Sequence, residues 1–370
     1  MATDAEEIQP FRIDIPQEQL DDLEQRLARI RWTDELPDAG DDYGVPLARL
    51  KEVVGYWRTE YDWRSWEARL NRYPQFTTVI DGQKIHFLHI RSEHQDATPL
   101  ILTHGWPMSV VEFLDVIEPL TAPERPEDAF HLVIPHLPGF GFSGPTAERG
   151  WNRYRTARAW AELMRRLGYR RYGAHGNDIG SYVSPELGRV APDRVIGAHV
   201  TQIFSFPSGD PAELAGLGEE DQGKVAYLEW FMANKGAFNK LHSTEPQTLA
   251  HALADSPVGQ LAWSLQLFGD AVSRDYTLTN VMVHWLTNTA ASSARFYYED
   301  AKAETPAEPT TVPLGLANFA YDFQAIRPLA DRDHKNIVSW HTYDRGGHFS
   351  AHDATDLLVE DIRGFFRELR

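Results

Sequence analysis

Apolar residues at helical spacing mark the first part of the chain. After Pro16 they recur every three or four positions, with acids and arginines between them. These positions are Leu20, Leu23, Leu27 and Ile30. The spacing predicts an amphipathic helix, preceded by a short strand over residues 11–15, and Pro46 begins a second helical stretch.

Three tryptophans follow in the same region. They are expected to be packing anchors, because large aromatic side chains are usually buried. They are Trp57, Trp63 and Trp66. Residues 1–75 carry no chemical motif, so they are predicted to form a cover segment laid over the main domain.

The pattern changes at residue 76, where short apolar runs replace the helical spacing. Two alternating runs, 76–80 and 84–90, flank Asp81-Gly82, which is a strong hairpin signal. Further strands are expected at residues 100–103, 132–135, 172–175, 195–203, 312–317 and 337–343. Helical stretches separate these strands, which predicts an α/β fold with a mostly parallel sheet and helices on both faces.

Residues from about 205 to 300 interrupt this alternation. They are helical in pattern and rich in Trp, Phe and Tyr. A helical insertion of this length predicts a lid over the carboxyl ends of the strands. The expected division is therefore a cover segment (1–75), a first part of the core (76–204), a helical lid (205–304) and a second part of the core (305–370).

Composition narrows the possible partners. The chain has 370 residues, 42% of them hydrophobic, which is enough for a large core. Its net charge of −18 repels phosphate backbones and anionic lipid, so it argues against nucleic-acid and membrane-surface partners. The chain has no Cys, which excludes disulfides and thiolate metal sites.

The N-terminal residues and the hydropathy of the chain bear on its cellular location. The first residues are acidic and lack a basic, then apolar, signal peptide. No run of about 18 apolar residues offers a membrane span. A soluble, cytoplasmic protein is expected, and a homodimer is the default assembly because two-fold dimers are the commonest.

A carboxylate stands at the most informative position. Residues 176–180, Gly-Asn-Asp-Ile-Gly, have the form Gly-x-nucleophile-x-Gly between a predicted strand and a helix, with Asp178 at the centre. This is the pattern of a nucleophile elbow, where the flanking glycines permit a sharp turn. Attack by an Asp on carbon gives an alkyl ester, which must then be hydrolysed at its own carbonyl.

Two further strand ends support this chemistry. His104-Gly105-Trp106-Pro107 follows the strand at 100–103, where a loop N–H can complete an oxyanion hole with the N–H after the nucleophile. We assign these backbone donors to Trp106 and Ile179. His348 follows the last strand, and the order of nucleophile, acid and His favours it as general base.

The acid that orients His348 should follow the preceding strand. Asp322 fits this position. The competitors are more typical of solvated surface charges; they are Asp331, Asp333 and Asp344. A tyrosine near the end of the lid could protonate a leaving oxygen, because it is neutral at pH 7 and can donate; Tyr297 and Tyr298 are the candidates.

The whole set of motifs resembles the epoxide hydrolases, specifically the microsomal and juvenile-hormone branch. The likeness runs nearly end to end and includes Phe11–Leu27, residues 104–107, 176–181, 255–259, 295–297, the strand ending at Asp322, and 345–349. It implies an α/β-hydrolase fold with an N-terminal epoxide hydrolase segment and a lid. It also implies no cofactor, no metal, a triad of Asp178, His348 and Asp322, and Tyr297 as a lid donor.

The chain departs from the family pattern at three positions. Ile179 stands where the family usually has Trp, and Asp322 where it often has Glu. Phe238 stands at or near the first of two lid tyrosines, and Phe cannot donate a proton. Either Tyr297 acts alone, or the substrate is unusual, or another residue substitutes; the candidates are Asn239, Trp230, Tyr227 and His242.

The leading hypothesis is an epoxide hydrolase that converts an apolar or aromatic epoxide to a vicinal diol, in detoxification or natural-product biosynthesis. The expected partners are the epoxide and water, with Phe238, Trp230 and Tyr298 lining the substrate pocket. Two alternatives stay open. One is a haloalkane dehalogenase-type hydrolase with the same Asp nucleophile, and the other is a small-molecule binding homologue without turnover.

Overall fold

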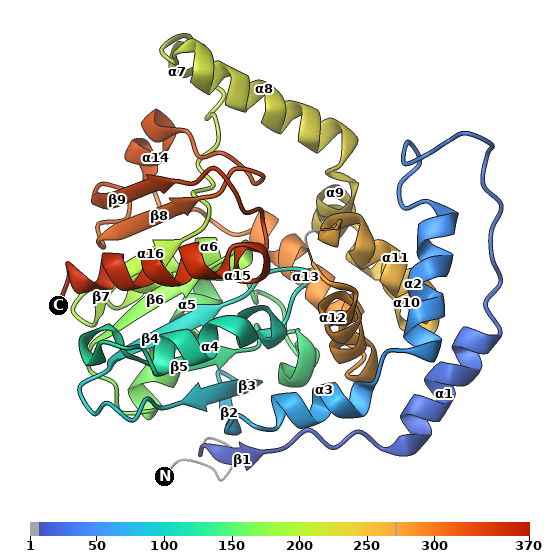
Figure 1. Ribbon diagram of the computed structural model, residues 1–370. Helices are drawn as coiled ribbons and strands as arrows, with labels where there is room; N and C mark the ends of the chain where they lie inside the picture. Colours follow the sequence, from blue (N-terminus) through green and yellow to red (C-terminus); the bar gives the residue numbers. More distant parts are fainter. Residues whose placement is uncertain (1–6, 271) are drawn as a thin grey trace.

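A twisted sheet forms the centre of the protein (Figure 1). Residues 7–270 and 272–370, which the computed structural model describes, contain a nine-stranded sheet in the order β1-β2-β3-β5-β4-β6-β7-β8-β9. The strands are β1 (Gln9–Phe11), β2 (Gln75–Ile80), β3 (Gln83–Ile90), β4 (Thr98–Thr103), β5 (Phe130–Pro135), β6 (Tyr172–Gly176), β7 (Val195–Val200), β8 (Leu314–Asn318) and β9 (Ile337–Thr342). The predicted strands 76–90, 100–103, 132–135 and 172–175 are confirmed within a residue or two.

Strand direction divides the sheet into two parts. β1, β2, β3 and β5 pair antiparallel, whereas β5, β4, β6, β7, β8 and β9 pair parallel. The predicted hairpin joins β2 to β3, and both turn residues have positive φ, 51° at Asp81 and 74° at Gly82. The parallel part gathers the carboxyl ends of its six strands at one edge, which is where reactive groups collect in such sheets.

Helices and short 3-10 turns cover both faces of the parallel part. They are η2 (Val110–Phe113), α4 (Leu114–Thr121), η3 (Pro126–Asp128), η4 (Gly141–Ser143), α5 (Arg153–Arg166), α6 (Ile179–Val190), α14 (Arg327–Asp333), α15 (Ser350–Asp353) and α16 (Thr355–Arg367). α4 packs with α16, and α5 with α6. In α16 the apolar residues Leu358, Ile362, Phe365 and Phe366 are buried. The predicted α/β-hydrolase arrangement of helices and sheet is confirmed.

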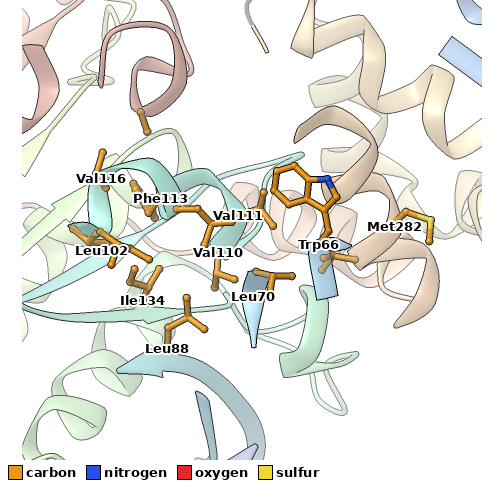
Figure 2. Close-up of a cluster of buried hydrophobic side chains, with 14 of the residues drawn as sticks. Trp66, Leu70, Leu88, Leu102, Val110, Val111, Phe113, Val116, Ile134 and Met282 are labelled. Atoms are coloured by element: carbon orange, nitrogen blue, oxygen red, sulfur yellow. The ribbon is translucent and has the colours of Figure 1, made fainter. Parts of the chain in front are cut away.

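The N-terminal segment holds α1 (Gln17–Ala28), α2 (Leu47–Thr59) and α3 (Trp63–Leu70). Its three tryptophans are buried in the same cluster as the core, as expected of packing anchors. Figure 2 shows Trp66 and Leu70 of α3 beside core residues of β3, β4, β5 and η2, with Met282 on the other side.

The strand expected over residues 11–15 is wrong in its bounds, because β1 ends at Phe11. Two buried isoleucines follow, and side chains of α3 and its C-cap satisfy their backbone N–H groups instead of a strand. The N–H of Ile13 donates to Asn71 (3.0 Å) and that of Ile15 to Glu67 (2.8 Å). Alternation of apolar residues therefore marked burial here rather than strand pairing.

The chain between β7 and β8 is mostly helical. Its helices are α7 (Pro211–Ala215), α8 (Glu219–Asn234), α9 (Ala237–Thr244), α10 (Pro246–Asp255), α11 (Pro257–Phe268), α12 (Arg274–Leu286) and α13 (Ala290–Ala301). α1 and α3 pack against α11 and α12, so the N-terminal segment supports this insertion as well as the core. The division of the chain into separate units at 75, 204 and 304 stays a prediction.

Candidate active site

A sharp turn after β6 presents Asp178 at the carboxyl edge of the sheet. Asp178 precedes α6 with φ 53° and ψ −116°, a conformation that is strained for a residue with a side chain. The turn requires the glycines on either side. A Cβ on Gly176 would lie 2.0 Å from the oxygen of Gly180, and one on Gly180 would lie 1.8 Å from the oxygen of Thr103.

Two backbone N–H groups contact the Asp178 carboxylate. The N–H of Trp106, in the loop after β4, donates to Oδ1 at 2.9 Å. The backbone N–H of Ile179, at the start of α6, also hydrogen-bonds this carboxylate. Gly105 leaves the space for the carboxylate, because a Cβ there would lie 2.2 Å from Oδ1. The structure thus brings both predicted oxyanion donors to the predicted nucleophile.

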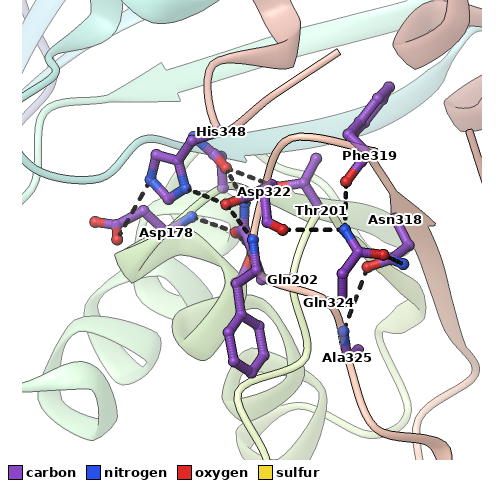
Figure 3. A network of polar contacts seen from close by, with 12 residues as sticks. Asp178, Thr201, Gln202, Asn318, Phe319, Asp322, Gln324, Ala325 and His348 are labelled. Carbon is purple, nitrogen blue, oxygen red and sulfur yellow. Dashed lines mark hydrogen bonds and ion pairs between the residues drawn. The ribbon is translucent and has the colours of Figure 1, made fainter. Parts of the chain in front are cut away.

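His348 lies between two carboxylates (Figure 3). Its Nδ1 is 2.8 Å from Oδ1 of Asp322, and its Nε2 is 3.7 Å from Oδ2 of Asp178. Asp322 follows β8 and His348 follows β9, as the order of motifs predicted. The competing acids lie elsewhere: Asp331 and Asp333 pair with arginines on α14, and Asp344 stands in the loop after β9.

The charges of this group are strongly coupled. Burial lowers the pKa of His348, but the charges of Asp322, Asp178 and Glu112 outweigh it and raise that pKa to about 9. Burial raises the pKa of Asp178, while the His348 charge and the two backbone hydrogen bonds lower it. At neutral pH His348 is therefore an imidazolium held between two acids.

Gln202, directly after β7, connects the nucleophile turn to the orienting acid. Its Oε1 accepts the backbone N–H of Asp178 at 2.8 Å, and its Nε2 donates to Oδ2 of Asp322 (Figure 3). The same Nε2 also donates to Oδ1 of Asn177 at 2.7 Å. The sequence analysis did not single out Gln202. The available signal was a polar residue following a buried parallel strand.

Glu112 is a second residue that sequence reasoning missed. It lies in η2, is 1% exposed, and accepts from Nδ2 of Asn177 at 2.8 Å. Burial raises its pKa to about 8, against lowering contributions from Asn177, His348 and Gly105. It is a buried carboxyl next to the catalytic candidates, and a glutamate inside an apolar run was the signal that could have found it.

Four aromatic side chains and a histidine pack together above the carboxylate; we call them the aromatic cluster. Its members are Trp106, Phe238, His242, Trp263 and Tyr297. Phe238 stacks on Trp106 with ring centroids 5.5 Å apart. Burial, with the charge of Asp178, raises the pKa of Tyr297 well above its usual value, so its hydroxyl keeps its proton.

The remaining pocket candidates lie outside this cluster. Trp230 on α8 is 49% exposed and stacks on Tyr227. Tyr298 faces Lys302 and lines a cavity of about 460 Å³ whose lining includes none of Asp178, Asp322 and His348. Of the substrate-pocket residues expected from the sequence, the structure brings only Phe238 to the aromatic cluster.

The described part of the chain offers neither a metal-binding cluster nor a membrane span. Within residues 7–270 and 272–370, no cluster of three or more His, Asp or Glu side chains could hold a metal ion. Across the same described parts of the chain, none of the helices has both the length and the apolar character needed to cross a bilayer.

Comparison with known proteins extends over nearly the whole chain. Residues 8–113 match the family described as epoxide hydrolase N terminus, and residues 98–285 match the alpha/beta hydrolase fold. A Stigmatella aurantiaca protein that carries the name "Putative epoxide hydrolase" is 43% identical over 98% of this chain and 86% of its own length. Epoxide hydrolase 1 of Sus scrofa is 31% identical over 98% of this chain and 89% of its own.

Solved structures of epoxide hydrolases are similar to this chain over nearly its whole length. Epoxide hydrolase from Aspergillus niger matches with a TM-score of 0.87 and 32% identity, covering 99% of this chain and 97% of its own. Juvenile hormone epoxide hydrolase from the silkworm Bombyx mori matches with a TM-score of 0.90 and 26% identity, covering 98% of this chain and 95% of its own.

Proposed function

This chain belongs to the epoxide hydrolase family, and we propose that it converts an apolar or aromatic epoxide to a vicinal diol through an ester formed on Asp178. One observation carries this mechanism. A carboxylate at a strained strand-to-helix turn contacts two backbone N–H groups and faces the imidazole of His348. A neutral tyrosine, Tyr297, belongs to the aromatic cluster beside it.

Ring opening is the first step. Oδ1 of Asp178 is occupied by the N–H of Trp106, so Oδ2 is the oxygen that attacks an epoxide carbon. As that C–O bond forms, the epoxide C–O bond breaks and its electron pair stays on the leaving oxygen. Tyr297 gives this oxygen its proton, which avoids release of a free alkoxide.

Ester hydrolysis is the second step, and it depends on a change of charge. Ester formation neutralises Asp178, which removes one of the charges that raise the pKa of His348. The imidazolium can then lose its proton to solvent, and the neutral ring takes a proton from the attacking water while Asp322 holds Nδ1. The water oxygen attacks the carbonyl carbon of Asp178, and the N–H groups of Trp106 and Ile179 stabilise the oxyanion. One such donor is typically worth about 3 kcal/mol in the transition state. Collapse of the oxyanion breaks the bond from that carbon to Oδ2, the departing diol oxygen takes its proton from His348, and the Asp178 carboxylate is restored.

The side chains around the carboxylate favour an apolar substrate. Trp106, Phe238 and Tyr297 present ring faces and edges toward one another above it. Apolar walls with a few polar groups are typical of small-molecule sites. The acidic surface, with a net charge of −18, supports a cytoplasmic enzyme that stays away from anionic lipid. The homodimer stays a prediction.

Labelled water tests the proposed mechanism directly. The enzyme is turned over many times on styrene oxide in ¹⁸O-water, and the peptide containing Asp178 is then analysed by mass spectrometry. We expect diol formation and ¹⁸O in the Asp178 carboxylate. Diol formation without label in that peptide would mean that water attacks the epoxide directly. Halide release from a chloroalkane, with no diol from any epoxide, would favour the dehalogenase alternative.

A further inference from the structure

His242 is a buried histidine within the aromatic cluster. It lies on α9 one turn after Phe238, so the two side chains share one face of the helix. Its exposure is 0%. Its ring centroid is 4.7 Å from that of Trp106 and 5.2 Å from that of Tyr297. These are the residues that supply a backbone N–H to Asp178 and the proposed proton to the leaving oxygen.

A hydrogen bond fixes the tautomer of this ring. Nε1 of Trp263 donates to Nε2 of His242 at 2.9 Å. An indole N–H can only donate, so Nε2 must be the acceptor and the single proton of the neutral ring sits on Nδ1. Burial lowers the pKa of His242 to about 3, so the ring stays neutral at any working pH.

The Nδ1–H has no hydrogen-bond partner within residues 7–270 and 272–370. An unpartnered buried donor is unfavourable, because the group has lost its hydrogen bonds to water without gaining others. Among the rings that pack against His242, those of Trp106, Phe238 and Trp263 carry no acceptor, and the Tyr297 hydroxyl makes no hydrogen bond to Nδ1. An unpartnered N–H within the aromatic cluster is suited to donate a hydrogen bond to an acceptor on the substrate.

We propose that the Nδ1–H of His242 donates a hydrogen bond to the epoxide oxygen during ring opening, as a second donor beside Tyr297. This inference rests on the proposed function. Oδ2 of Asp178 still forms the new C–O bond, and the epoxide oxygen still takes its proton from Tyr297. His242 keeps its own proton throughout and stabilises the negative charge that develops on that oxygen. The proton lost by Tyr297 is replaced by the one released when water hydrolyses the ester.

The same geometry explains how the site can operate with Phe238. The Phe238 ring stacks on Trp106 and lies 6.1 Å from the ring of Tyr297, but it offers only carbon atoms. His242 lies one helical turn further along and 6.2 Å away, and it presents an N–H to the same cluster. The donor is thus supplied by the neighbouring turn of α9.

Two substitutions separate hydrogen bonding from packing. Asn carries a terminal amide close to the position of the imidazole Nδ1, so His242→Asn can keep the donor while losing ring contacts. His242→Phe keeps an aromatic ring and loses the donor. Each of these substitutions is combined with His348→Gln, so that the Asp178 ester accumulates. The rate at which this ester forms from styrene oxide is measured by rapid quench and intact-protein mass spectrometry.

The proposal predicts that His242→Phe slows ester formation at least tenfold, which is less than the loss of about 100- to 1000-fold that is typical for removal of one oxyanion-hole donor. His242→Asn should be faster than His242→Phe. Adding Phe238→Tyr to His242→Phe should recover most of the lost rate, because it returns a hydroxyl to the cluster. A pure packing role predicts the reverse order, with His242→Phe faster than His242→Asn, and that order would overturn the proposal.

The parent His348→Gln protein distinguishes failure of the proposed function from failure of the proposed role of His242. If it forms no ester while His242 is intact, the proposed function fails. If it forms ester and the His242→Phe version does so at the same rate, only the role of His242 fails. Should His242→Asn not fold, as judged by circular dichroism and thermal unfolding, recovery by Phe238→Tyr in the His242→Phe background decides the question. No recovery there counts against the proposal.

Discussion

Nε2 of His348 lies 3.7 Å from Oδ2 of Asp178, too far for a normal hydrogen bond but close enough for strong charge coupling. The distance suits a base that must act on water beside the Asp178 carbonyl rather than on Asp178 itself. Because of this short distance, any change in the charge of Asp178 also changes the pKa of His348. The hydrolysis step of the proposed mechanism depends on this coupling.

Replacing His348 by Gln should trap the ester. The amide cannot act as a base, whereas attack by Asp178 does not need one, so alkylation continues and hydrolysis stops. We expect a covalent adduct with the mass of one epoxide, located on the peptide containing Asp178, and steady-state turnover reduced by about 1000-fold or more. Intact-protein mass spectrometry after incubation with styrene oxide measures it.

Asp178→Asn is the matched control for this trap. It removes the nucleophile and keeps the size of the side chain, so it should form no adduct with either His or Gln at position 348. An adduct on another residue in that variant would show that simple chemical alkylation, rather than the site, produces the signal. Full turnover by His348→Gln would contradict the assignment of the base.

The stability of the free enzyme should fall as the solution becomes alkaline. The pKa of His348 is raised from 6.5 to about 9 in the folded protein. A raised histidine pKa contributes stability that is fully present below pH 6.5 and is lost as the pH rises through about 9. The thermal unfolding midpoint should therefore drop over this interval, and His348→Gln should show a smaller drop.

The hydrolysis step should have a lower apparent pKa than the free enzyme. Once Asp178 is an ester it carries no charge, so it no longer raises the pKa of His348. Stopped-flow measurement of ester decay against pH should show a rate that rises with pH and reaches its plateau well below pH 9. A midpoint at or above 9 would mean that Asp178 does not set the protonation of His348.

Loss of the Tyr297 hydroxyl should slow ring opening and leave the fold intact. Tyr297→Phe removes the proton donor, and general acid catalysis is typically worth about 100- to 10,000-fold. Tyr298→Phe is the matched control on the same helix, because Tyr298 contacts Lys302 and a separate cavity. Single-turnover ester formation should fall by about 100-fold or more in the first variant and by less than about threefold in the second. Equal effects would remove Tyr297 from its role.

Strong local patterns made much of the fold predictable. Period-two alternation around Asp81-Gly82 and separate apolar runs gave the strands, because buried parallel strands need continuous apolar residues. The bounds at residues 11–15 could not be predicted in the same way. There Asn71 and Glu67 of a distant segment accept the backbone N–H groups, a contact that only the folded chain creates.

The same distinction between local patterns and long-range contacts applies to the residues of the candidate site. Asp178, Asp322 and His348 stand in recognisable local contexts, so their meeting at the sheet edge could be predicted. Gln202 and Glu112 act through partners far away in sequence, such as Asp322 and Asn177. Their local signals, a polar residue after a buried strand and a glutamate in an apolar run, do not specify those partners. The placement of His242 against Trp106 likewise depends on how the insertion folds onto the core.

A buried carboxylate, Asp361, connects α16 to the sheet and is expected to stabilise the fold. Asp361 of α16 is 4% exposed and binds His199 of β7 and His341 of β9, each at 3.0 Å, and Tyr343 also donates to it. Burial raises the pKa of Asp361, but the His199 hydrogen bond and charge and the Tyr343 and His341 contributions outweigh it, so the pKa is lowered. The stability from this carboxylate is present above its unfolded pKa of about 4 and is lost as the pH falls below it.

Asp361→Asn should therefore destabilise the protein at pH 7 by about 1–3 kcal/mol, because the amide cannot accept all the hydrogen bonds that the carboxylate accepts. Asp356→Asn on the same helix is the control: its carboxylate is 71% exposed and pairs with Arg345 on the surface, so we expect a change below about 0.5 kcal/mol. Urea unfolding at pH 7 and near pH 3 measures both, and the gap in unfolding free energy between the two variants should narrow at the lower pH, where the carboxylate becomes protonated. Equal destabilisation at pH 7 would show that the buried network adds nothing beyond a surface ion pair.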